Sequence, residues 1–305
     1  MFKKKIYITT SNFHVKKNKL ESFFSKKKFI VIKACIGRKY TETEIISKFK
    51  DAYAIIAGTE KYTSTVLNSL KNLKYISRCG VGTDSIDLVA IKKNKIKLLK
   101  TKNSHIYIVA EHAIAGMFTI LKNIAAFNLE LKNKIWKKKN VATLFKKNIG
   151  FYGYGRIAKQ IHNNLINLGS NFLYYDLNNN NNKKKIKRVK TLKSLFKYSD
   201  IIFICSSLMN NKYSINKKIL NSNKGKKIII NTSRGELIND KDLIQYLKKN
   251  KESSYFSDVF NKEPYYGPMI NLPNAIFTPH VATYEPYFRL NMELECLENL
   301  SKIIK

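Results

Sequence analysis

Residues 149–158 read Ile-Gly-Phe-Tyr-Gly-Tyr-Gly-Arg-Ile-Ala, a Gly-x-Gly-x-x-Ala turn that follows a strand-like run and opens a helix. Gly153 permits the tight turn, Gly155 lets the backbone approach a pyrophosphate, and the small Ala158 allows the helix and strand to pack closely. The N–H groups and the positive dipole end at the helix start favour phosphate groups. This stretch predicts a dinucleotide-binding α/β domain.

A carboxylate stands where such a domain needs one. Asp176 closes the next strand, 21 residues after Gly155, close to the spacing of about 20 expected for the acid that binds the ribose. No arginine follows Asp176 directly, so a 2′-phosphate would be repelled. The sequence therefore predicts NAD rather than NADP as cofactor.

Strand-like runs alternate with amphipathic segments on both sides of this turn, which predicts an α/β fold with parallel sheets. A length of 305 residues suggests about two domains. A capping box of Thr41 and Glu44 begins one helix, a single long helix is expected over Tyr107 to Asn133, and the tract 178–185 is expected to be a surface loop. We expect strands at Lys5–Thr10, Phe29–Lys33, Tyr53–Gly58, Lys74–Arg78, Ile96–Leu99, Asn148–Tyr152, Asn171–Tyr175, Ile201–Cys205, Lys226–Asn231, Ser254–Val259 and Ala275–Thr278.

The net charge of +36 would by itself suggest a nucleic-acid partner. However, only six of the 57 basic residues are arginines, and arginine is the side chain that reads bases and grips phosphates. Abundant lysine, asparagine and isoleucine indicate drift toward A/T-rich codons. We expect non-specific adhesion to nucleic acid at low salt, and no specific nucleic-acid partner.

Other classes are disfavoured by simple features. No stretch approaches the roughly 18 consecutive apolar residues of a membrane span, and the start of the sequence lacks a signal-peptide pattern. The four cysteines are far apart, which indicates neither a disulfide framework nor a zinc cluster. We expect a cytoplasmic globular protein with no metal.

Three polar segments each follow a predicted strand, at residues 231–235, 258–264 and 278–282. In open α/β sheets ligands bind beyond the carboxyl ends of the strands, so these segments should face one crevice. Arg234 can hold a carboxylate, His280 can take a hydroxyl proton, and Glu263 would favour and orient the imidazolium. The set suits oxidation of a hydroxy acid. The remaining histidines are expected to be structural: His14, His105, His112 and His162.

The chain resembles the D-isomer-specific 2-hydroxyacid dehydrogenases, most closely their phosphoglycerate-dehydrogenase-like branch. The resemblance runs nearly end to end, and the ordered trio Asn-Thr-x-Arg-Gly, Asp-Val-Phe-x-x-Glu-Pro and Thr-Pro-His is its most specific part. Further matching segments are residues 36–42, 56–60, 77–87 and 109–113.

The resemblance implies two doubly wound, Rossmann-like domains. Residues 1–100 with 284–305 would form the substrate domain and residues 101–283 the NAD-binding domain. It also implies a homodimer built largely on the long helix after Val109. The implied catalytic residues are Arg234, Glu263 and His280; the cofactor contacts add Arg156, Ile157, Thr232, Ser233 and Asp258, and the substrate contacts add Val81 and Gly82.

The sequence departs from the family pattern at several points. Ala158 replaces the usual third glycine, residues 204–209 replace a stretch beside the adenine, residues 102–105 replace a loop near the substrate, and an arginine usual near the third strand is absent at 58–61. Lys61, Arg78 and Lys102 are the cations that could instead meet a phosphate.

We therefore expect an NAD-dependent enzyme that interconverts a D-2-hydroxy acid and its 2-keto acid, with an anionic, phosphorylated three-carbon substrate. Reduction of glyoxylate or hydroxypyruvate is the alternative within this class. A non-catalytic NAD-binding sensor is an alternative from another class, although a sensor would not need Arg234, Glu263 and His280. A nucleic-acid-binding protein and a methyltransferase fit the sequence less well.

Overall fold

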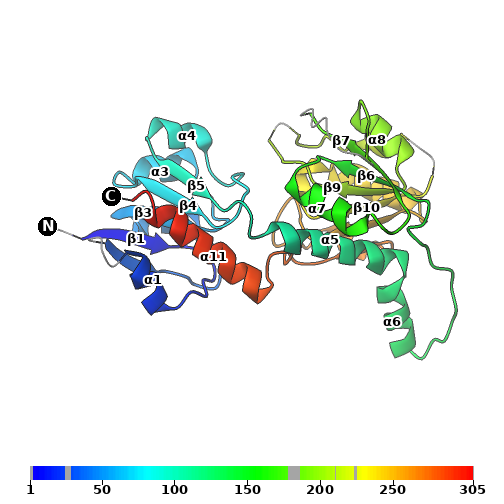
Figure 1. Cartoon of the computed structure of the whole chain (residues 1–305), viewed down its shortest axis with the longest axis horizontal. Helices are drawn as coiled ribbons and strands as arrows, with labels where there is room; N and C mark the ends of the chain where they lie inside the picture. The colour runs from blue at the N-terminus through cyan, green and yellow to red at the C-terminus, as the bar shows by residue number, and fades with distance from the viewer. Residues whose placement is uncertain (1–2, 25–28, 178–185, 210, 223–224, 305) are drawn as a thin grey trace. The chain divides into compact units, whose positions relative to one another are not determined.

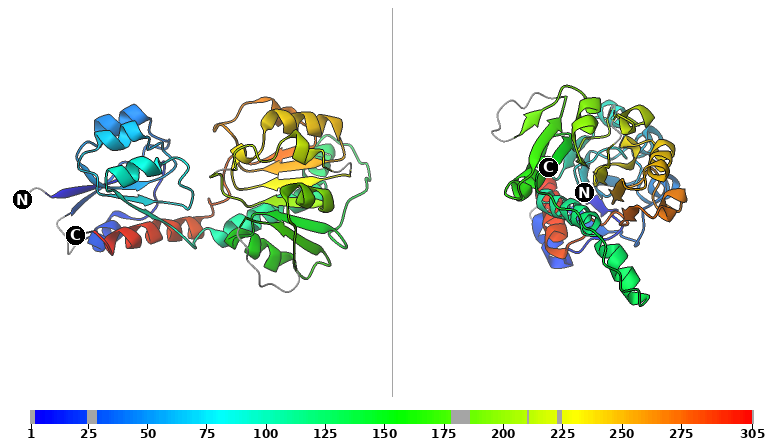
Figure 2. Two further views of the ribbon diagram at one scale, coloured as in Figure 1. Left: turned by 90° about the horizontal axis from the view of Figure 1, so that it is seen from above. Right: turned by 90° about the vertical axis from the view of Figure 1, so that its right-hand side faces the viewer.

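The computed structural model describes residues 3–24, 29–177, 186–209, 211–222 and 225–304. The chain forms two compact units: unit 1 comprises Met1–His105 and Tyr284–Lys305, and unit 2 comprises Ile106–Thr283 (Figure 1). Each contains one parallel sheet, with helices on both faces of the sheet (Figure 2). The predicted α/β fold class is confirmed. The expected loop at 178–185 lies outside the described residues.

Unit 1 has a five-stranded sheet in the order β2-β1-β3-β4-β5. Its strands are β1 (Lys4–Ile8), β2 (Phe29–Lys33), β3 (Ala52–Ala57), β4 (Tyr75–Arg78) and β5 (Lys97–Lys100). The helices α2 (Glu42–Lys48), α3 (Ser64–Ser69) and α4 (Leu88–Lys93) bury apolar side chains on one face of the sheet. On the other face lie α1 (Lys17–Phe24) and the C-terminal α11 (Pro286–Ser301).

Unit 2 has a seven-stranded sheet in the order β12-β11-β10-β9-β6-β7-β8. Its strands are β6 (Asn148–Tyr152), β7 (Asn171–Tyr175), β8 (Lys187–Arg188), β9 (Ile201–Ile204), β10 (Ile228–Asn231), β11 (Ser254–Ser257) and β12 (Ala275–Phe277). The chain winds to one side through β6, β7 and β8 and then to the other from β9 onward. The order therefore reverses between β6 and β9, which is where ligands bind in such sheets.

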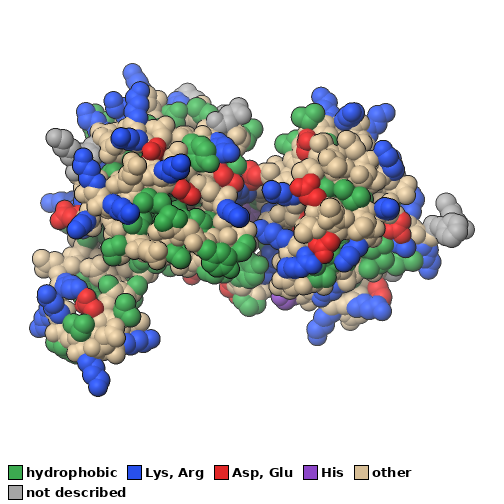
Figure 3. Space-filling view, turned by 180° about the vertical axis from the view of Figure 1, so that it is seen from behind, with side chains coloured by type: hydrophobic (Ala, Val, Ile, Leu, Met, Phe, Trp, Pro, Cys, Tyr) green, Lys and Arg blue, Asp and Glu red, His purple; other side chains and the backbone are tan. Residues whose placement is uncertain are grey.

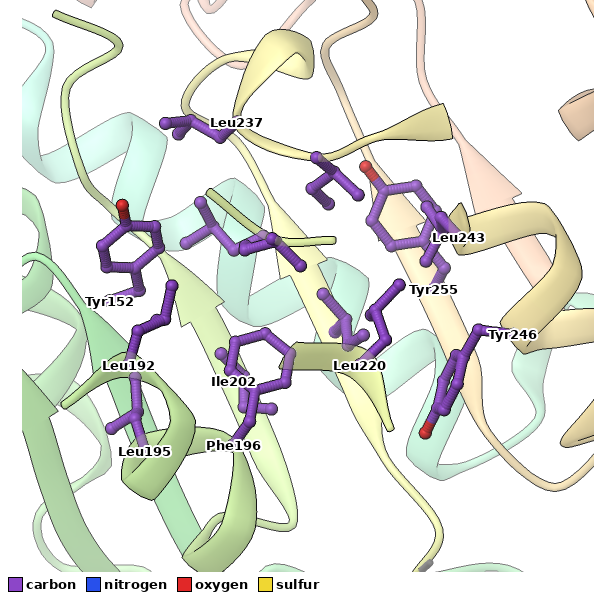
Figure 4. Close-up of a cluster of buried hydrophobic side chains, with 14 of the residues drawn as sticks. Tyr152, Leu192, Leu195, Phe196, Ile202, Leu220, Leu237, Leu243, Tyr246 and Tyr255 are labelled. Carbon is purple, nitrogen blue, oxygen red and sulfur yellow. The ribbon is translucent and has the colours of Figure 1, made fainter. Parts of the chain in front are cut away.

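Apolar side chains alternate between the two faces of this sheet because successive strand residues point in opposite directions. Ile202 and Ile204 belong to one buried cluster, and Phe203 between them belongs to the other. Figure 4 shows the first cluster, which α8 (Leu192–Tyr198), α9 (Lys217–Leu220) and α10 (Asp240–Lys249) cover. The helices α5 (Ile106–Leu121) and α7 (Arg156–Leu165) cover the second cluster. Short 3₁₀ turns are η1 (Gly235–Leu237) and η2 (Pro268–Asn271).

The prediction of one long helix over 107–133 is wrong. The segment forms α5 and then α6 (Ile124–Lys132), which are bent by 58°. Asn123 at the break has a φ of 51°, a left-handed conformation that asparagine tolerates, and the Leu121 carbonyl accepts a hydrogen bond from the Ala142 N–H at 2.9 Å. The returning chain thus ends α5. Among the described residues no single helix is long and apolar enough to cross a membrane; α5 and α6 pass that test only as a bent pair, by length and composition.

Candidate functional site

The predicted site residues of unit 2 follow one row of residues that are paired across the sheet. The row consists of Tyr175, Tyr152, Ile204, Asn231, Ser257 and Phe277. Because these strands are parallel, the next residues on each strand emerge at the same edge. The structure therefore brings together the glycine turn, Asp176 and the segments that begin at Thr232, Asp258 and Thr278, as the sequence predicts.

The glycine turn lies between β6 and α7. Gly153 has a φ of +83°, and a Cβ there would lie 2.7 Å from the backbone of Ser206, so only glycine fits. Gly155 is the N-cap residue of α7, and within the described chain no side chain caps this helix end. A Cβ on Gly155 would meet no atom within 4 Å. The first turn of α7, which carries Arg156 and Ile157, thus offers backbone N–H groups to an open space, which suits a pyrophosphate.

Tyr154 belongs to this turn and holds it in place through its buried side chain. Its ring stacks on Tyr174 at 4.6 Å between centroids, and its hydroxyl lies 2.6 Å from Nδ1 of His162. Burial raises the pKa of Tyr154 to about 12, so the hydroxyl keeps its proton at neutral pH while it is paired with His162. His162 is therefore structural, as expected. No sequence pattern indicates its pairing with Tyr154.

Asp176 lies directly beside the turn. Its Oδ2 accepts a hydrogen bond of 2.7 Å from the Tyr154 N–H, which places the carboxylate where a ribose would meet it. The structure also brings an arginine here, because the Arg188 guanidinium donates to the Asp176 carbonyl oxygen at 3.0 Å. The sequence shows no arginine next to Asp176, since Arg188 arrives through the short strand β8. Lysines 183–185 lie outside the described residues.

The segment after β10 is held by its own hydrogen bonds. Asn231 donates from Nδ2 to the Arg234 carbonyl oxygen at 2.9 Å and accepts from the Ser233 N–H at 3.0 Å. The Ser233 hydroxyl donates to the Ser206 carbonyl oxygen at 2.6 Å, which links this segment to the chain after β9, whose backbone packs against Gly153. A Cβ on Gly235 would lie 2.1 Å from the Phe260 backbone, so glycine there lets the two neighbouring segments touch.

Thr232 and Arg234 are partly buried on this segment. The guanidinium of Arg234 donates from Nη1 to the Ser233 carbonyl oxygen at 2.7 Å, which holds the guanidinium against the backbone of its own segment. A guanidinium presents five donors in a planar fork, a geometry that suits a carboxylate.

His280 and Glu263 form the predicted pair. His280 Nδ1 lies 2.9 Å from Oε2 and 3.0 Å from Oε1 of Glu263, so Nδ1–H donates to the carboxylate and Nε2 remains the nitrogen that can exchange a proton. The Phe260 N–H also donates to Glu263, at 3.2 Å. His280 has a φ of 57°, a conformation uncommon for any residue with a side chain and often found at functional sites.

Asp258 is fully buried beside this pair. Its Oδ1 accepts from the Thr278 hydroxyl at 2.6 Å and from the Val281 N–H at 2.8 Å, and its Oδ2 accepts from the Ala282 N–H at 3.0 Å. Burial alone would raise the pKa of Asp258, but hydrogen bonds from His112, Thr278 and the two amides together hold that pKa below its usual value. The carboxylate therefore stays ionised and organises the loop that carries His280.

His112 of α5 is the site residue that sequence reasoning missed. Its Nε2 lies 3.0 Å from the Thr278 hydroxyl oxygen and 3.5 Å from Oδ1 of Asp258. His112 and Thr278 are 166 residues apart in the sequence, so no local pattern links them. The one available signal is that His112 stands within the matching segment 109–113.

In unit 1, the predicted contacts Val81 and Gly82 lie on the loop after β4. Arg78 is 8% exposed; its Nε donates to the Gly82 carbonyl oxygen at 3.0 Å, and its Nη1 donates to the Cys79 carbonyl oxygen. Arg78 thus shapes the loop that contains Val81 and Gly82.

The other predicted cations of unit 1 are surface residues. Lys61 and Lys102 are exposed. Next to Lys61, Glu60 is 1% exposed and accepts from the Gly58 N–H at 2.7 Å; burial raises the pKa of this carboxyl.

Comparison with known families assigns most of unit 2 to one family. Residues 114–282 match the family described as D-isomer specific 2-hydroxyacid dehydrogenase, NAD binding domain. The match contains the glycine turn, Asp176 and the three segments that follow β10, β11 and β12.

Similar proteins extend the match over most of the chain. A hydroxypyruvate reductase of Thermotoga maritima is 30% identical over 249 residues, which cover 79% of this chain and 81% of that protein. A D-3-phosphoglycerate dehydrogenase of Methanocaldococcus jannaschii is 31% identical over 79% of this chain, but the chain spans only 47% of its length. The crystal structure of a glyoxylate reductase from Paecilomyes thermophila has the same fold, with a TM-score of 0.87 at 24% identity, covering 100% of this chain and 96% of the other.

Proposed function

Because the chain belongs to the D-isomer-specific 2-hydroxyacid dehydrogenase family, we propose that it moves a hydride between C2 of a small D-2-hydroxy acid and NAD. The observation that carries this proposal is the His280–Glu263 pair, 2.9 Å apart, on the same sheet edge as Arg234 and the glycine turn. An acid–base group beside a cofactor-binding turn is what oxidation of a hydroxyl requires.

The residues of unit 2 fit NAD. The turn at Gly153 and Gly155 and the first turn of α7, with Arg156 and Ile157, would hold the pyrophosphate. Asp176 would accept hydrogen bonds from the ribose hydroxyls. Thr232, Ser233 and Asp258 would lie on the nicotinamide side, and when bound NAD supplies the hydride acceptor or donor.

The proton is moved by this chain's own side chains. In oxidation, Nε2 of His280 takes the proton of the substrate hydroxyl. Nδ1 keeps its own proton and continues to donate a hydrogen bond to the Glu263 carboxylate. The carboxylate stabilises the imidazolium that forms. In reduction the same imidazolium returns the proton to the keto oxygen. Arg234 would bind the substrate carboxylate and carbonyl through its guanidinium fork, and the backbone of Val81 and Gly82 would also contribute to binding the carboxylate.

Reduction of an unphosphorylated acid such as glyoxylate or hydroxypyruvate is the second candidate, and one observation favours it over phosphoglycerate oxidation. Arg78, the arginine expected to meet a phosphate, is buried and donates to the Gly82 and Cys79 carbonyl oxygens. Lys61 and Lys102 offer only single, exposed charges, without the fork of arginine.

One assay series tests both levels of the proposal. Purified protein is given NADH with glyoxylate, hydroxypyruvate or 3-phosphohydroxypyruvate, and NAD with D-glycerate or 3-phosphoglycerate, at fixed ionic strength. Turnover of any 2-keto acid supports the dehydrogenase. A higher kcat/KM for the unphosphorylated member of each pair supports the second candidate. NADH binding without turnover of any of these acids would instead indicate a sensor.

The assembly proposed is a cytoplasmic homodimer. In unit 2, α6 and the chain after it form an arm, residues 122–141, and no residue of α6 is buried. The arm exposes Ile124, Leu129, Leu131, Ile135 and Trp136, the last by 82%. Figure 3 shows this arm, at the lower left, with apolar side chains among its lysines. Apolar groups at such density suit a contact with a second copy of the chain.

A further inference from the structure

His112 lies at the contact between α5 and the loop that carries His280. Its side chain is 23% exposed, and its ring packs on Phe256 of β11 with 5.6 Å between ring centroids. Its Nε2 is 3.0 Å from Oγ1 of Thr278 and 3.5 Å from Oδ1 of Asp258. One nitrogen of His112 therefore faces both polar partners of the loop.

The direction of these hydrogen bonds follows from the proton count. The Thr278 hydroxyl has a single proton, and it donates that proton to Oδ1 of Asp258 at 2.6 Å because a carboxylate can only accept. Oγ1 of Thr278 must then accept from His112, so Nε2 of His112 carries a proton. The result is a directed chain from His112 through Thr278 to Asp258.

Asp258 in turn restrains the loop that carries His280. Its two oxygens accept from the N–H groups of Val281 and Ala282 at 2.8 and 3.0 Å, immediately after His280. His280 itself has a φ of 57°, which costs free energy and persists only when its surroundings fix it. The hydrogen bonds of Asp258 supply that restraint on the C-terminal side of His280.

We propose that His112 is a positioning residue for the reaction. Its Nε2–H fixes the Thr278 hydroxyl, and thereby the Asp258 carboxylate and the loop that aims the His280 ring. This inference rests on the proposed function, in which His280 exchanges the substrate proton. His112 touches neither the reacting atoms nor His280, so it acts through Asp258.

Two substitutions separate the N–H donor from the packing of the ring. His112→Phe keeps an aromatic ring against Phe256 and removes the donor. His112→Gln gives up the ring but keeps an N–H at about the reach of Nε2. A role in packing alone predicts that Phe is the better replacement, whereas a positioning role predicts that Gln is. Thr119→Val, at a partly buried position of α5 where the hydroxyl donates to the Ala115 carbonyl oxygen at 2.9 Å, is the matched control.

The first measurement is steady-state reduction of the best 2-keto acid by NADH. We expect His112→Phe to lower kcat about tenfold, the loss expected for one buried hydrogen bond, with the KM for NADH within about twofold of wild type. His112→Gln should restore kcat to within about threefold of wild type. The control Thr119→Val should have the kcat of wild type. A wild-type kcat in His112→Phe, or a larger loss in His112→Gln than in His112→Phe, would overturn the proposal.

The second measurement tests the chain of hydrogen bonds through Thr278. If His112 acts through that hydroxyl, Thr278→Val should lower kcat about as far as His112→Phe, and the double variant should lose little more than either single one. Losses that multiply in the double variant would show that the two residues act independently, which contradicts the inference.

Amide hydrogen exchange gives a readout that needs no turnover. Exchange of the peptide 278–283 should be faster in His112→Phe than in wild type and close to wild type in His112→Gln. A wild-type protein that turns over no 2-keto acid would remove the proposed function, yet this exchange result would still decide whether His112 holds the loop. An active wild type whose exchange and kcat do not change in His112→Phe would remove only the inference.

Discussion

The guanidinium of Arg188 donates a hydrogen bond of 3.0 Å to the backbone carbonyl oxygen of Asp176. The Asp176 carboxylate meanwhile accepts from the Tyr154 N–H at 2.7 Å. The sheet edge beside the glycine turn therefore holds both an acid and an arginine. The acid repels a 2′-phosphate, whereas the arginine can bind one. The carboxylate is tied to the glycine turn itself, whereas Arg188 is an exposed residue on a two-residue strand.

We predict that NADH is preferred to NADPH, by at least about tenfold in kcat/KM. Asp176→Ala should reduce that preference, mainly by raising the KM for NADH. Arg188→Gln should leave NADH kinetics within about twofold and lower the residual use of NADPH. Equal use of the two cofactors by the wild type would contradict the role of Asp176, and a loss of NADH use in Arg188→Gln would contradict the role assigned to Arg188.

His280→Ala should lower kcat by roughly 10²–10⁴-fold, the contribution of a placed acid–base group. NADH binding, followed by fluorescence titration, should persist because no contact of His280 reaches the glycine turn. Lys262→Ala, an exposed neighbour of Glu263, is the control and should keep wild-type kcat. Turnover that survives in His280→Ala would assign the proton transfer to another group.

Glu263→Gln should also lower kcat, by about tenfold or more, because a neutral amide stabilises the imidazolium less than a carboxylate does. The Gln oxygen can still accept from the Phe260 N–H, which at present donates to Glu263 at 3.2 Å, so the loop should keep its fold. Equal melting temperatures of wild type and variant would verify that point. An unchanged kcat would show that the pairing of Glu263 with His280 has no part in turnover.

Arg78→Lys should raise the KM for 2-keto acids about tenfold while the KM for NADH stays unchanged. Lysine cannot replace both bonds of the guanidinium to the Gly82 and Cys79 carbonyl oxygens, and bonds to a charged donor are among the stronger ones. Arg38→Lys, which alters an exposed ion pair with Glu44 in the same unit, is the control. A rise confined to phosphorylated substrates would instead make Arg78 a phosphate ligand.

The grouping of the candidate site residues of unit 2 was predictable because these residues follow strands that the apolar pattern identifies well. The strands Asn148–Tyr152 and Asn171–Tyr175 are observed as predicted. Once strands are parallel and in register, residues such as Asp176, Asp258 and Thr278 must emerge together. Their association needs no knowledge of side-chain contacts.

Contacts between distant elements were not predictable in the same way. Arg188 reaches Asp176 only through the pairing of β8 with β7, and His112 reaches Thr278 from a helix on the face of the sheet. The break after α5 depends on a left-handed Asn123 and on a hydrogen bond from the distant Ala142. Helical periodicity continues through such a break, so the pattern alone predicts one helix.

Asp258 should give part of the stability of unit 2 a defined pH dependence. Because hydrogen bonds hold the pKa of Asp258 below its usual value in the folded chain, its contribution is complete above the unfolded-state pKa of about 3.9. The contribution is lost as pH falls through the lower, folded-state pKa. Asp258→Asn should therefore be less stable by about 1–3 kcal/mol at pH 7, and the difference from wild type should shrink below about pH 4.

Urea unfolding at a series of pH values measures this difference. Burial raises the pKa of Asp240, so the wild type should become more stable relative to Asp240→Asn as pH falls. Asp240→Asn is therefore the control of opposite sign. A constant difference between wild type and Asp258→Asn down to pH 3 would mean that the carboxylate does not titrate with folding.

The arm of unit 2 should hold the dimer together. Trp136→Glu combined with Leu129→Glu places two charges on side chains that are 82% and 62% exposed in the single chain, so the substitutions should not disturb the core of unit 2. If the arm is an interface, they bury charge in the dimer and should convert it to monomer. Light scattering after size-exclusion chromatography gives the mass directly. Tyr266→Glu, at an 84% exposed position that is not part of the arm, should stay dimeric. A wild type that is monomeric at tens of micromolar would contradict the interface itself.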